Sequence, residues 1–469
     1  MKFTAINIGP VISTLGMARR PRELWAASYL FSHLMKCIYA EAKKCELTIV
    51  SPAEPEEDAG KVGLYPDRLY IRGEVDARTV LTKALGFFCA DLHGQKDSAD
   101  TVPDLNYFNL MSVTCEAEKE SEAVRLLNHK LDVMELCQYA ADSDAAQTIR
   151  AIVTKKLSSP LFELATGKDR MIVPELEDIA HAQCIVPGVK EKSHHRYFCV
   201  VQADGDNFGK TVTNPGLKDG EIRQISKKLM DFGLCATAKI EEFGGFPVYA
   251  GGDDLLFIAP VVGKTGDNIF NLLDIIENDA FKGVVDKVNQ MGLKDKDGNP
   301  IEASLSFGVS ITYYKYPLYE ALESARTLLF KNAKKQKPAV AWSLRKHSGG
   351  TFDATLSLKN ADLKERFVRL IEATTDRDTV SAVAHKLREA DKLVDIVLES
   401  GQPDRLDALF DKILEFDRDK ADYFNAIKDI MPVLYKTVGK NEFIQTLYSL
   451  LRTARFLKGE DIREEDENE

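Results

Sequence analysis

The tetrapeptide Gly251-Gly-Asp-Asp254 stands between two β-rich runs, Phe246-Pro-Val-Tyr-Ala250 before it and Leu255-Leu-Phe-Ile-Ala259 after it. Glycines accept the positive φ that a tight turn needs, so the pattern predicts a β-hairpin with the tetrapeptide at its turn. Two carboxylates then lie at the tip of an otherwise apolar ribbon. Because solvated aspartates are common in turns, the tetrapeptide alone does not distinguish a polar turn from a site of chemistry.

A second acidic stretch lies upstream, at the end of another predicted strand. The apolar run Tyr197-Phe-Cys-Val-Val-Gln-Ala203 is typical of a buried strand, and it continues directly into Asp204-Gly-Asp-Asn207. If this strand and the hairpin are neighbours in one sheet, their carboxylates converge. Such oxygen ligands hold two Mg²⁺ ions roughly 4 Å apart in two-metal nucleotidyl-transfer sites. The combination therefore favours a two-metal site over two unrelated acidic turns.

Length and composition indicate a soluble globular protein of two to four domains, with 469 residues, 44% hydrophobic and 29% charged. The net charge of -11 argues against nonspecific coating of nucleic acid, although a local basic groove or RNA held by partner subunits is allowed. No apolar run approaches the roughly 20 residues that cross a bilayer, and the start lacks a signal-peptide pattern. We expect a cytoplasmic protein with no membrane partner.

The cysteines show no pattern typical of metal binding or of disulfides. The eight residues lack a Cys-x-x-Cys pair and fall mostly within apolar stretches, at positions 37, 45, 89, 115, 137, 184, 199 and 235. They are interpreted as reduced core residues. His194 and His195 with Cys199 would form a metal site only with a fourth ligand at suitable spacing, so a polar lead-in to the strand is favoured.

The N-terminal part has the element order of a ferredoxin-like palm. The expected elements are a strand over 1–8, a helix from about 22, strands over 47–50 and 69–71, and a helix over about 76–90. The hairpin position, Gly63-Leu-Tyr-Pro-Asp-Arg68, has no carboxylate pair, so this copy is predicted to have no metal site of its own. An ordinary small α/β domain explains the same pattern equally well.

The second α/β domain repeats this order around both acidic stretches. Helices over about 219–243 and 267–290, and a strand over 303–313, complete a βαββαβ pattern with the strand and hairpin described above. In this topology the first strand lies beside the paired central strands, which brings the acidic ends together. A further helix over 317–337 ends in Lys331, Lys334, Lys335 and Lys337. The helix dipole explains such lysines, and contact with the phosphates of a Mg-nucleotide explains them equally well.

The predicted fold is α+β, with two ferredoxin-like palm domains of the polymerase and nucleotide cyclase kind. The domain boundaries are a degenerate first palm over 1–95, a mainly helical domain over 96–192, a second palm with the Gly-Gly-Asp-Asp site over 193–350, a helical bundle over 351–458, and an acidic tail over 459–469. The bundle is expected to be a docking surface for partners, and the tail is expected to be disordered.

Three stretches together resemble a known family. They are Asp204-Gly-Asp206, Gly251-Gly-Asp-Asp254, and Ile8-Gly-Pro-Val-Ile-Ser13 followed by Arg22-Glu-Leu-Trp-Ala-Ala-Ser-Tyr-Leu30. The combination is similar to the large palm-polymerase subunit of type III CRISPR-Cas effector complexes, of the Cmr type (III-B). Tyr65-Pro-Asp-Arg-Leu-Tyr70 is similar to that family's first-palm hairpin. The likeness runs from residue 1 to the terminal helical domain, whereas either acidic motif alone would not be specific.

The resemblance implies an adenylyltransferase that target RNA switches on by pairing with the guide RNA of the complex. By this analogy Asp204 and Asp253 are ligands of two Mg²⁺ or Mn²⁺ ions, and Asp254 is a ligand or assists the base. The residues implied to contact ATP are Gly205, Asp206, Gly251, Gly252, Lys331, Lys334 and Lys335. A hydroxyl of an acceptor held by the first palm would attack the α-phosphate in line and release pyrophosphate. The implied partners are other Cmr-type subunits, guide RNA and target RNA.

The chain departs from the family pattern in two respects. It starts directly at the first palm with no His-Asp dipeptide, so no HD nuclease activity is expected, and it lacks the family's four-cysteine element, so no zinc is expected. In the family the acceptor is usually a second ATP, giving cyclic oligoadenylate. A branch without the nuclease domain is thought to join AMP to S-adenosylmethionine. Both products remain open at this point.

Two other functions compete with this hypothesis. A diguanylate cyclase has the same palm and a Gly-Gly-Asp-Glu-Phe hairpin, but here Asp254-Leu255 replaces Glu-Phe and a second palm-like domain precedes the active one. A purely structural subunit of the ribonucleoprotein would need no intact acidic set. The complete set of aspartates therefore argues against a structural subunit.

Overall fold

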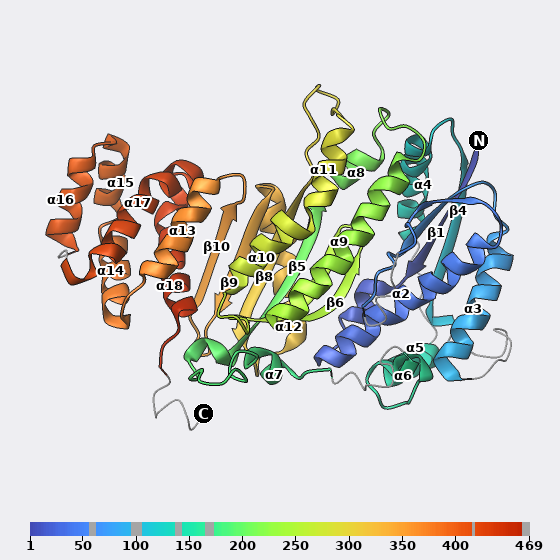
Figure 1. Ribbon diagram of the computed structural model, residues 1–469, viewed down its shortest axis with the longest axis horizontal. Coiled ribbons are helices and arrows are strands. Elements are labelled where there is room, and N and C mark those ends of the chain that lie inside the picture. Colours follow the sequence, from blue (N-terminus) through green and yellow to red (C-terminus); the bar gives the residue numbers. More distant parts are fainter. Residues whose placement is uncertain (56–61, 95–105, 137–142, 165–172, 415–417, 462–469) are drawn as a thin grey trace.

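The computed structural model describes residues 1–55, 62–94, 106–136, 143–164, 173–414 and 418–461. An N-terminal α/β unit, a central α/β unit and a C-terminal group of helices follow one another along the long axis of the molecule (Figure 1). This mixture of two sheets and a helical end agrees with the predicted α+β class. Within the described part of the chain, no helix combines the length and apolar character that a bilayer crossing requires.

The N-terminal sheet has four antiparallel strands in the order β2-β3-β1-β4. Its strands are β1 (Lys2–Gly9), β2 (Thr48–Ser51), β3 (Arg68–Arg72) and β4 (Asn109–Glu116). Alternate side chains of β1 enter two cores, because successive residues of a strand point to opposite faces. Ile6 and Ile8 share a core with residues of α2 (Pro21–Lys43) and α3 (Ala77–His93), whereas Phe3 and Ala5 share one with residues of α4 (Glu120–Glu135).

Strand β4 lies beyond the boundary predicted at residue 95, in the segment predicted to be mainly helical. It pairs with the whole of β1, from Lys2 opposite Glu116 to Gly9 opposite Asn109. Most of its side chains are exposed or half-buried, so it lacks the apolar run that identifies a buried strand in a sequence. The remaining helices of this part are α1 (Val11–Leu15), α5 (Ser143–Val153), α6 (Pro160–Leu164), α7 (Leu176–Ala180) and the 3₁₀ turn η3 (Ser193–Arg196).

The central sheet has six strands in the order β10-β9-β8-β5-β7-β6. They are β5 (Tyr197–Asp206), β6 (Phe246–Gly251), β7 (Asp254–Pro260), β8 (Ser304–Tyr313), β9 (Ala339–Arg345) and β10 (Thr351–Ser357). The four strands β8-β5-β7-β6 repeat the connectivity of the N-terminal sheet, and the prediction that β5 neighbours the hairpin is confirmed. Strands β9 and β10 are additional, and β10 lies beyond the boundary predicted at residue 350.

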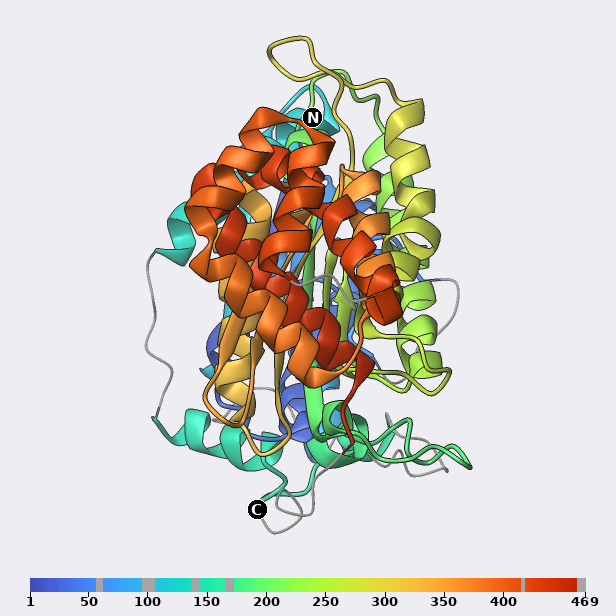
Figure 2. The same ribbon diagram turned by 90° about the vertical axis from the view of Figure 1, so that its left-hand side faces the viewer.

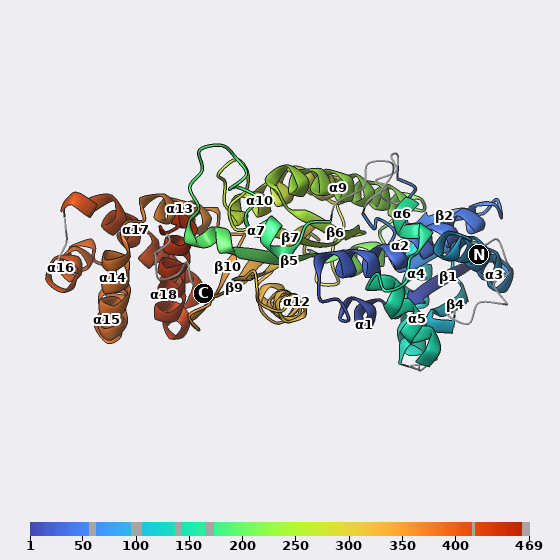
Figure 3. The ribbon, with the colours of Figure 1, turned by 90° about the horizontal axis from the view of Figure 1, so that it is seen from below.

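Helices cover both faces of the central sheet. One face carries α8 (Phe208–Val212), α9 (Glu221–Phe243), α10 (Ile269–Ile275), the π-helical turn η4 (Ile276–Ala280) and α11 (Lys282–Gln290). The other face carries α12 (Leu318–Thr327), the π-helical turn η5 (Leu328–Asn332) and the 3₁₀ turn η6 (Ala333–Lys335). Figure 3 shows α9 and α12 on opposite sides of the sheet. The single helix predicted over 317–337 is therefore three successive segments.

The two α/β units meet along β6. Helix α2 packs against this strand, and the Ala250 amide donates a hydrogen bond to the Gly63 carbonyl at 3.0 Å. A bridge between Gly63 and Tyr249 continues the contact. The segment of the N-terminal unit that precedes β3 consequently lies beside the hairpin of the central unit.

The C-terminal helices share a core with the central sheet, and Figure 2 shows them grouped at this end of the molecule. They are α13 (Ala361–Ala373), α14 (Arg377–Glu389), α15 (Asp391–Ser400), α16 (Pro403–Ile413), η7 (Arg418–Lys420), α17 (Ala421–Val438) and α18 (Lys440–Lys458). The Trp342 indole donates a hydrogen bond of 3.1 Å to Thr453. Of the tail predicted to be disordered, residues 459–461 are ordered against Lys192 and Ser193; residues 462–469 lie outside the described residues.

Candidate active site

The predicted hairpin is confirmed, and its turn consists of Gly252 and Asp253. The last pair of the hairpin joins Gly251 to Asp254, and Gly252 has a φ of 65°, which glycine adopts without a side-chain clash. On its other side β7 pairs with β5, and the final pair of that ladder places Asp254 opposite Asp204. Directly opposed residues of antiparallel strands have Cα atoms about 4.5–5.5 Å apart. The two acidic stretches therefore meet as the sequence predicts.

Gly205 permits the close approach of the turn to the end of β5. Its amide donates a hydrogen bond of 3.1 Å to the Asp253 carbonyl. A Cβ atom at this position would lie 2.5 Å from the Phe208 ring and 2.7 Å from the Asp253 Cβ. Neither neighbour can move freely, because Phe208 is buried in the core and Asp253 lies in a two-residue turn. Glycine is thus required here for a steric reason.

Asp206 contacts the rest of the chain rather than open space. It is 1% exposed and accepts hydrogen bonds from the hydroxyls of Ser304 and Ser306 on β8, at 2.9 and 2.8 Å. It also pairs with the Lys334 ammonium at 2.8 Å. These contacts satisfy its oxygens and place Asp206 below the hairpin carboxylates as a support for the lysine.

Lys334 is the member of the predicted lysine group that the fold brings to the carboxylates. Its ammonium donates to the carbonyls of Asp204 and Gly205, both at 2.8 Å, and forms an ion pair with the Asp204 carboxylate. Lys331 and Lys335 are exposed on the same helical segment. The π-helical turn η5 widens the helix just before Lys334, a feature often found at functional sites.

Burial and mutual repulsion disfavour the ionised forms of the two hairpin aspartates. Burial first, and the Asp204 charge second, raise the pKa of Asp253 to about 7. Burial, with the charges of Asp253 and Asp204, raises the pKa of Asp254 well above its usual value. Lys334 opposes this effect for Asp253. Crowded carboxylate oxygens with a single nearby ammonium fit hard divalent cations such as Mg²⁺ or Mn²⁺, which supply the missing positive charge.

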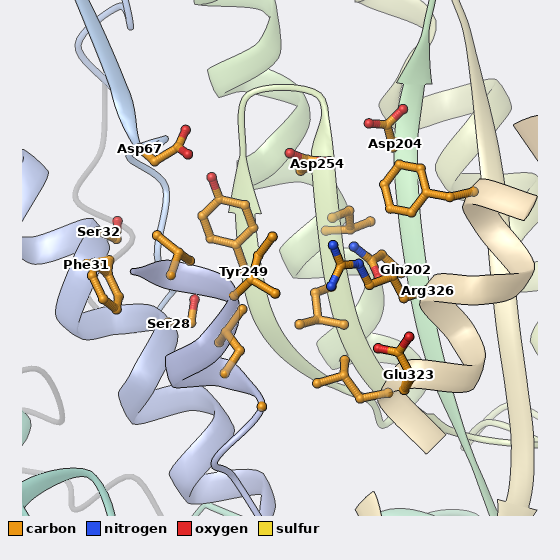
Figure 4. Close-up of a pocket in the computed structure, with 18 of the residues that line it drawn as sticks. Ser28, Phe31, Ser32, Asp67, Gln202, Asp204, Tyr249, Asp254, Glu323 and Arg326 are labelled. Atoms are coloured by element: carbon orange, nitrogen blue, oxygen red, sulfur yellow. The ribbon is translucent and has the colours of Figure 1, made fainter. Parts of the chain in front are cut away.

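A cavity of about 520 Å³ opens beside Asp204 and Asp254, and its walls come from both α/β units. Figure 4 shows Asp67, Ser28, Ser32 and Phe31 on the N-terminal side, facing Tyr249 and Asp254, with Gln202, Glu323 and Arg326 on the other side. The volume falls within the usual range for small-molecule sites. The carboxylates thus lie at the edge of a space large enough for a nucleoside-sized group.

Two polar residues of this cavity lie between the α/β units and were not predicted as site residues. Desolvation by the surrounding protein raises the pKa of Asp67, which directly precedes β3 and has an exposed side chain in the cavity wall. Burial raises the pKa of Tyr249 well above its usual value, and the charges of Asp254 and Asp67 add to the effect. The Tyr249 hydroxyl would lie 2.3 Å from a Cβ atom at Gly251, so a side chain at that glycine would displace it. The motif at residues 65–70 was the sequence signal that could have identified Asp67.

Other predicted features away from this cavity have structural roles. His194 and His195 are buried, and burial lowers their pKa values to about 3 and about 4. The Lys192 amide donates to His195, and the other ring nitrogen of His195 lies 2.6 Å from the Gln183 side-chain oxygen. Every cysteine of the described chain is a free thiol. The interpretation of the histidines as a polar lead-in to β5 is consistent with these contacts.

Two family models match parts of the two α/β units. The family described as "Cas10/Cmr2, second palm domain" matches residues 197–341, and the family described as "CRISPR-associated protein Cmr2, N-terminal" matches residues 3–54. The CRISPR system Cmr subunit Cmr2 of Pyrococcus furiosus is 27% identical over 230 residues, which cover 42% of this chain and 24% of the relative. The chain therefore spans about a quarter of the length of that curated relative.

Solved structures show the same fold at low sequence identity. A Csm1-Csm4 cassette in complex with cA4 matches with a TM-score of 0.53 and 13% identity, covering 97% of this chain and 69% of the other. A Csm1-Csm4 cassette in complex with AMPPNP matches at 0.53 and 14%, with the same coverage. A type III-B Cmr-beta structure in the apo state matches at 0.51 and 11%, covering 86% and 76%. The solved structures show a shared fold, and the two family matches show that the chain contains a second palm domain of the Cas10/Cmr2 kind and part of a Cmr2 N-terminal region.

Proposed function

We propose that this chain is an ATP adenylyltransferase that makes an adenylate second messenger within an RNA-guided antiviral complex. Target RNA that pairs with the guide would switch the reaction on. Support comes from relatives of the same fold whose structures contain AMPPNP or cA4. The observation that carries the proposal is the pairing of Asp204 with Asp254, with Asp253 in the adjoining turn.

The acidic residues divide into two proposed roles. Asp204, Asp253 and Asp254 would hold two Mg²⁺ or Mn²⁺ ions, which when bound would activate the attacking hydroxyl and stabilise the leaving pyrophosphate. Asp206, which accepts from two serines and from Lys334, would position that lysine rather than bind an ion. This assignment places Asp206 outside the metal ligands.

Lys334 is the residue that we assign to the triphosphate. Its ammonium already lies against Asp204 and Asp206, so it would keep the acidic strand ends together before ATP binds. A triphosphate that reached the same carboxylates through their cations would come close to this ammonium. Gly251 and Gly252 would let the phosphates approach the turn without a side-chain clash. Lys331 and Lys335, both exposed, would act only by long-range attraction.

The N-terminal unit would act as a degenerate palm that holds the acceptor. Its sheet has the strand order of the central one, and it contributes Asp67 and Ser32 to the cavity beside Asp254. An acceptor in this cavity would have its hydroxyl on the side of the hairpin carboxylates. Either a second ATP, which gives cyclic oligoadenylate, or S-adenosylmethionine, which gives an AMP adduct, would be the acceptor.

The proposed partners are those with which the relatives occur. We propose that other Cmr-type subunits, guide RNA and target RNA assemble with this chain, since a similar chain occurs in a Cmr-beta structure and others occur with Csm4. The C-terminal helices would dock against these subunits, and the complex would act in the cytoplasm.

The proposal is tested with the assembled complex, guide RNA and target RNA. Mass spectrometry would identify the product made from ATP with and without S-adenosylmethionine, and radiolabelled ATP and GTP would be offered separately. We expect an adenylate product that requires both a divalent cation and target RNA. Incorporation from GTP alone would indicate a diguanylate cyclase instead. Equal ATP turnover by the wild type and an Asp253→Ala, Asp254→Ala variant would rule out the proposed site.

A further inference from the structure

A second cavity, of about 520 Å³, lies between the central sheet and the C-terminal helices. It adjoins Tyr197, the first residue of β5, whereas Asp204 lies seven residues further along the same strand. At about 3.3 Å per residue the two sites are roughly 23 Å apart. The second cavity is therefore separate from the candidate active site.

Positive charge is concentrated around this cavity although the whole chain carries a net charge of -11. Lys346 and Arg377 line it, and Arg452 and Arg455 lie close enough to act on the Lys346 ammonium. Burial and these three arginines lower the pKa of Lys346 to about 8, although the Glu460 charge opposes this shift. Among the described residues that line the cavity, Glu460 is the one carboxylate, and it forms an ion pair with Arg455.

The positive charge around the cavity exceeds the counter-charge of the described residues that line it, although Arg452 and Arg455 also donate hydrogen bonds to Ser381 of α14. Arg455 is only 4% exposed, and its Nε atom has no hydrogen-bond partner. Arg377 is exposed at the first turn of α14, where a cation is unfavourable next to the positive end of the helix dipole. A buried cation without sufficient counter-charge is costly, so the arrangement favours an anionic ligand.

Aromatic rings lie beside these cations. Tyr197 packs edge-on against Phe456 with ring centroids 4.8 Å apart, and Tyr313 lies 4.7 Å from the ring of the exposed His347. All four residues line the cavity. Cationic groups that bind phosphate, next to rings on which a base can stack, are typical of sites for nucleotides and single-stranded nucleic acid.

We propose that this cavity binds a phosphate group carried by a nucleotide, either free or within single-stranded RNA, and that Glu460 competes with it for Arg455. Lys346 and Arg377 contact the phosphate, and the accessible rings of Tyr313 and His347 contact the base. The Glu460 backbone is held in place because its carbonyl accepts a hydrogen bond of 2.8 Å from the Ser193 amide. The Glu460 carboxylate can still leave Arg455 and turn to solvent when a phosphate enters the cavity.

The test measures fluorescence anisotropy of a fluorescein-labelled ten-nucleotide single-stranded RNA with the full chain in EDTA, which keeps divalent cations from the hairpin carboxylates. We expect a Lys346→Ala, Arg377→Ala variant to bind the RNA at least tenfold more weakly than the wild type. The matched control, Arg369→Ala with Lys392→Ala, removes two exposed cations outside the cavity and is expected to stay within twofold. If the double variant unfolds, Arg377→Ala alone, at an exposed position, is expected to weaken RNA binding by a smaller factor.

The Glu460→Gln variant is expected to change the affinity for RNA in the opposite direction. Loss of the competing carboxylate is expected to tighten RNA binding at least threefold, which a merely structural Glu460 would not do. AMP is expected to displace the RNA whereas adenosine is not, and the relative affinities of AMP and RNA identify the source of the phosphate. Equal binding by the cavity variants and the control, weaker binding by Glu460→Gln, or displacement by adenosine as effectively as by AMP would each overturn the proposal.

Discussion

The two sheets of this chain share one connectivity and differ in charge at one corresponding position. In the central sheet the ladder between the first and third strands ends with Asp204 opposite Asp254, whereas in the N-terminal sheet it ends with Asn7 opposite Arg68. The backbone position is the same, because both pairs close the ladder at the start of the third strand. The difference shows that the shared connectivity brings two strand ends together, while the residues there decide whether cations are attracted.

The N-terminal pair is neutralised by its neighbours. Arg68 forms ion pairs with Asp132 at 2.9 Å and Glu135 at 2.8 Å, both from α4. Asn7 donates a hydrogen bond of 2.6 Å to Glu135. The central pair instead has Lys334 as its described cationic partner, shared with Asp206. The charges at the N-terminal strand ends are therefore paired within the protein, whereas the central strand ends retain an excess of negative charge.

The connections between the second and third strands also differ. In the central sheet a two-residue turn places Asp253 and Asp254 at the tip of the ribbon. In the N-terminal sheet the connection is long, and its last part pairs with β6 through Gly63 and presents Asp67 to the shared cavity. One hairpin is thus suited to hold cations, and the other is suited to close the cavity beside them.

The largest expected effect comes from removal of the hairpin carboxylates. An Asp253→Ala, Asp254→Ala variant is expected to lose at least about 100-fold in ATP turnover by the assembled complex, since metal ligation supplies several kcal/mol of transition-state stabilisation. Asn7→Ala, at the position of the N-terminal sheet that corresponds to Asp204, is expected to change turnover by less than about threefold. Comparable losses in both variants would contradict the assignment of the site to one sheet.

A smaller loss is expected when a methyl group is added beside the turn. Gly205→Ala forces Phe208 or Asp253 to move, so we expect turnover to fall about tenfold or more and stability to fall by about 1–3 kcal/mol. Gly209→Ala is the control, because a Cβ atom there has no neighbour within 4 Å. ATP turnover and thermal unfolding of both variants check this, and equal effects would show that Asp253 is not constrained by Gly205.

Removal of Lys334 is expected to act mainly before cations bind. Lys334→Met leaves Asp204 and Asp206 without their ammonium, and we expect a loss of about 2 kcal/mol in EDTA. Mg²⁺ should then raise the midpoint of thermal unfolding more in this variant than in the wild type, because the ions replace the lost charge. Arg68→Met, whose partners are largely exposed, is expected to lose less than about 1 kcal/mol and to show no added response to Mg²⁺.

The smallest effect expected is a pH dependence near the acidic strand ends. Burial first, with the charges of Asp274 and Asp206, raises the pKa of Glu277 to about 7, although Lys364 opposes the shift. The folded state therefore holds this proton more tightly than the unfolded state, and stability falls as the pH rises from about 4.5 to 7. Glu277→Gln should have a free energy of unfolding about 1–2 kcal/mol higher than the wild type at pH 8, and the same as the wild type near pH 4.5.

The control for Glu277→Gln is a substitution in the N-terminal unit. Glu135→Gln removes an ion-pair partner of Arg68, so no stabilisation at pH 8 is expected from it. A gain in both variants, measured by thermal unfolding at the two pH values, would show that the excess of negative charge is not specific to the central sheet.

Much of the candidate site was predictable because its signals are local in the sequence. Two glycines and two aspartates between apolar runs specify a hairpin, and the apolar strand before Asp204 specifies its buried neighbour. Strands β4, β9 and β10 were missed or placed outside their sheet. Of these, β4 is an exposed edge whose own pattern is weak. The apolar run of β9 and the alternating burial of β10 are typical of strands, and the structure shows that both extend the central sheet.

By itself the sequence determined the two repeated α/β patterns, the helical end and the acidic residues that meet at Asp204 and Asp254. Only the tertiary structure selected Lys334 from its neighbours and placed Asp67 and Tyr249 in the cavity. The physical reason is the separation in sequence over which each effect acts. Turn and strand preferences act over a few residues. The charge and burial around a carboxylate depend on elements more than a hundred residues apart.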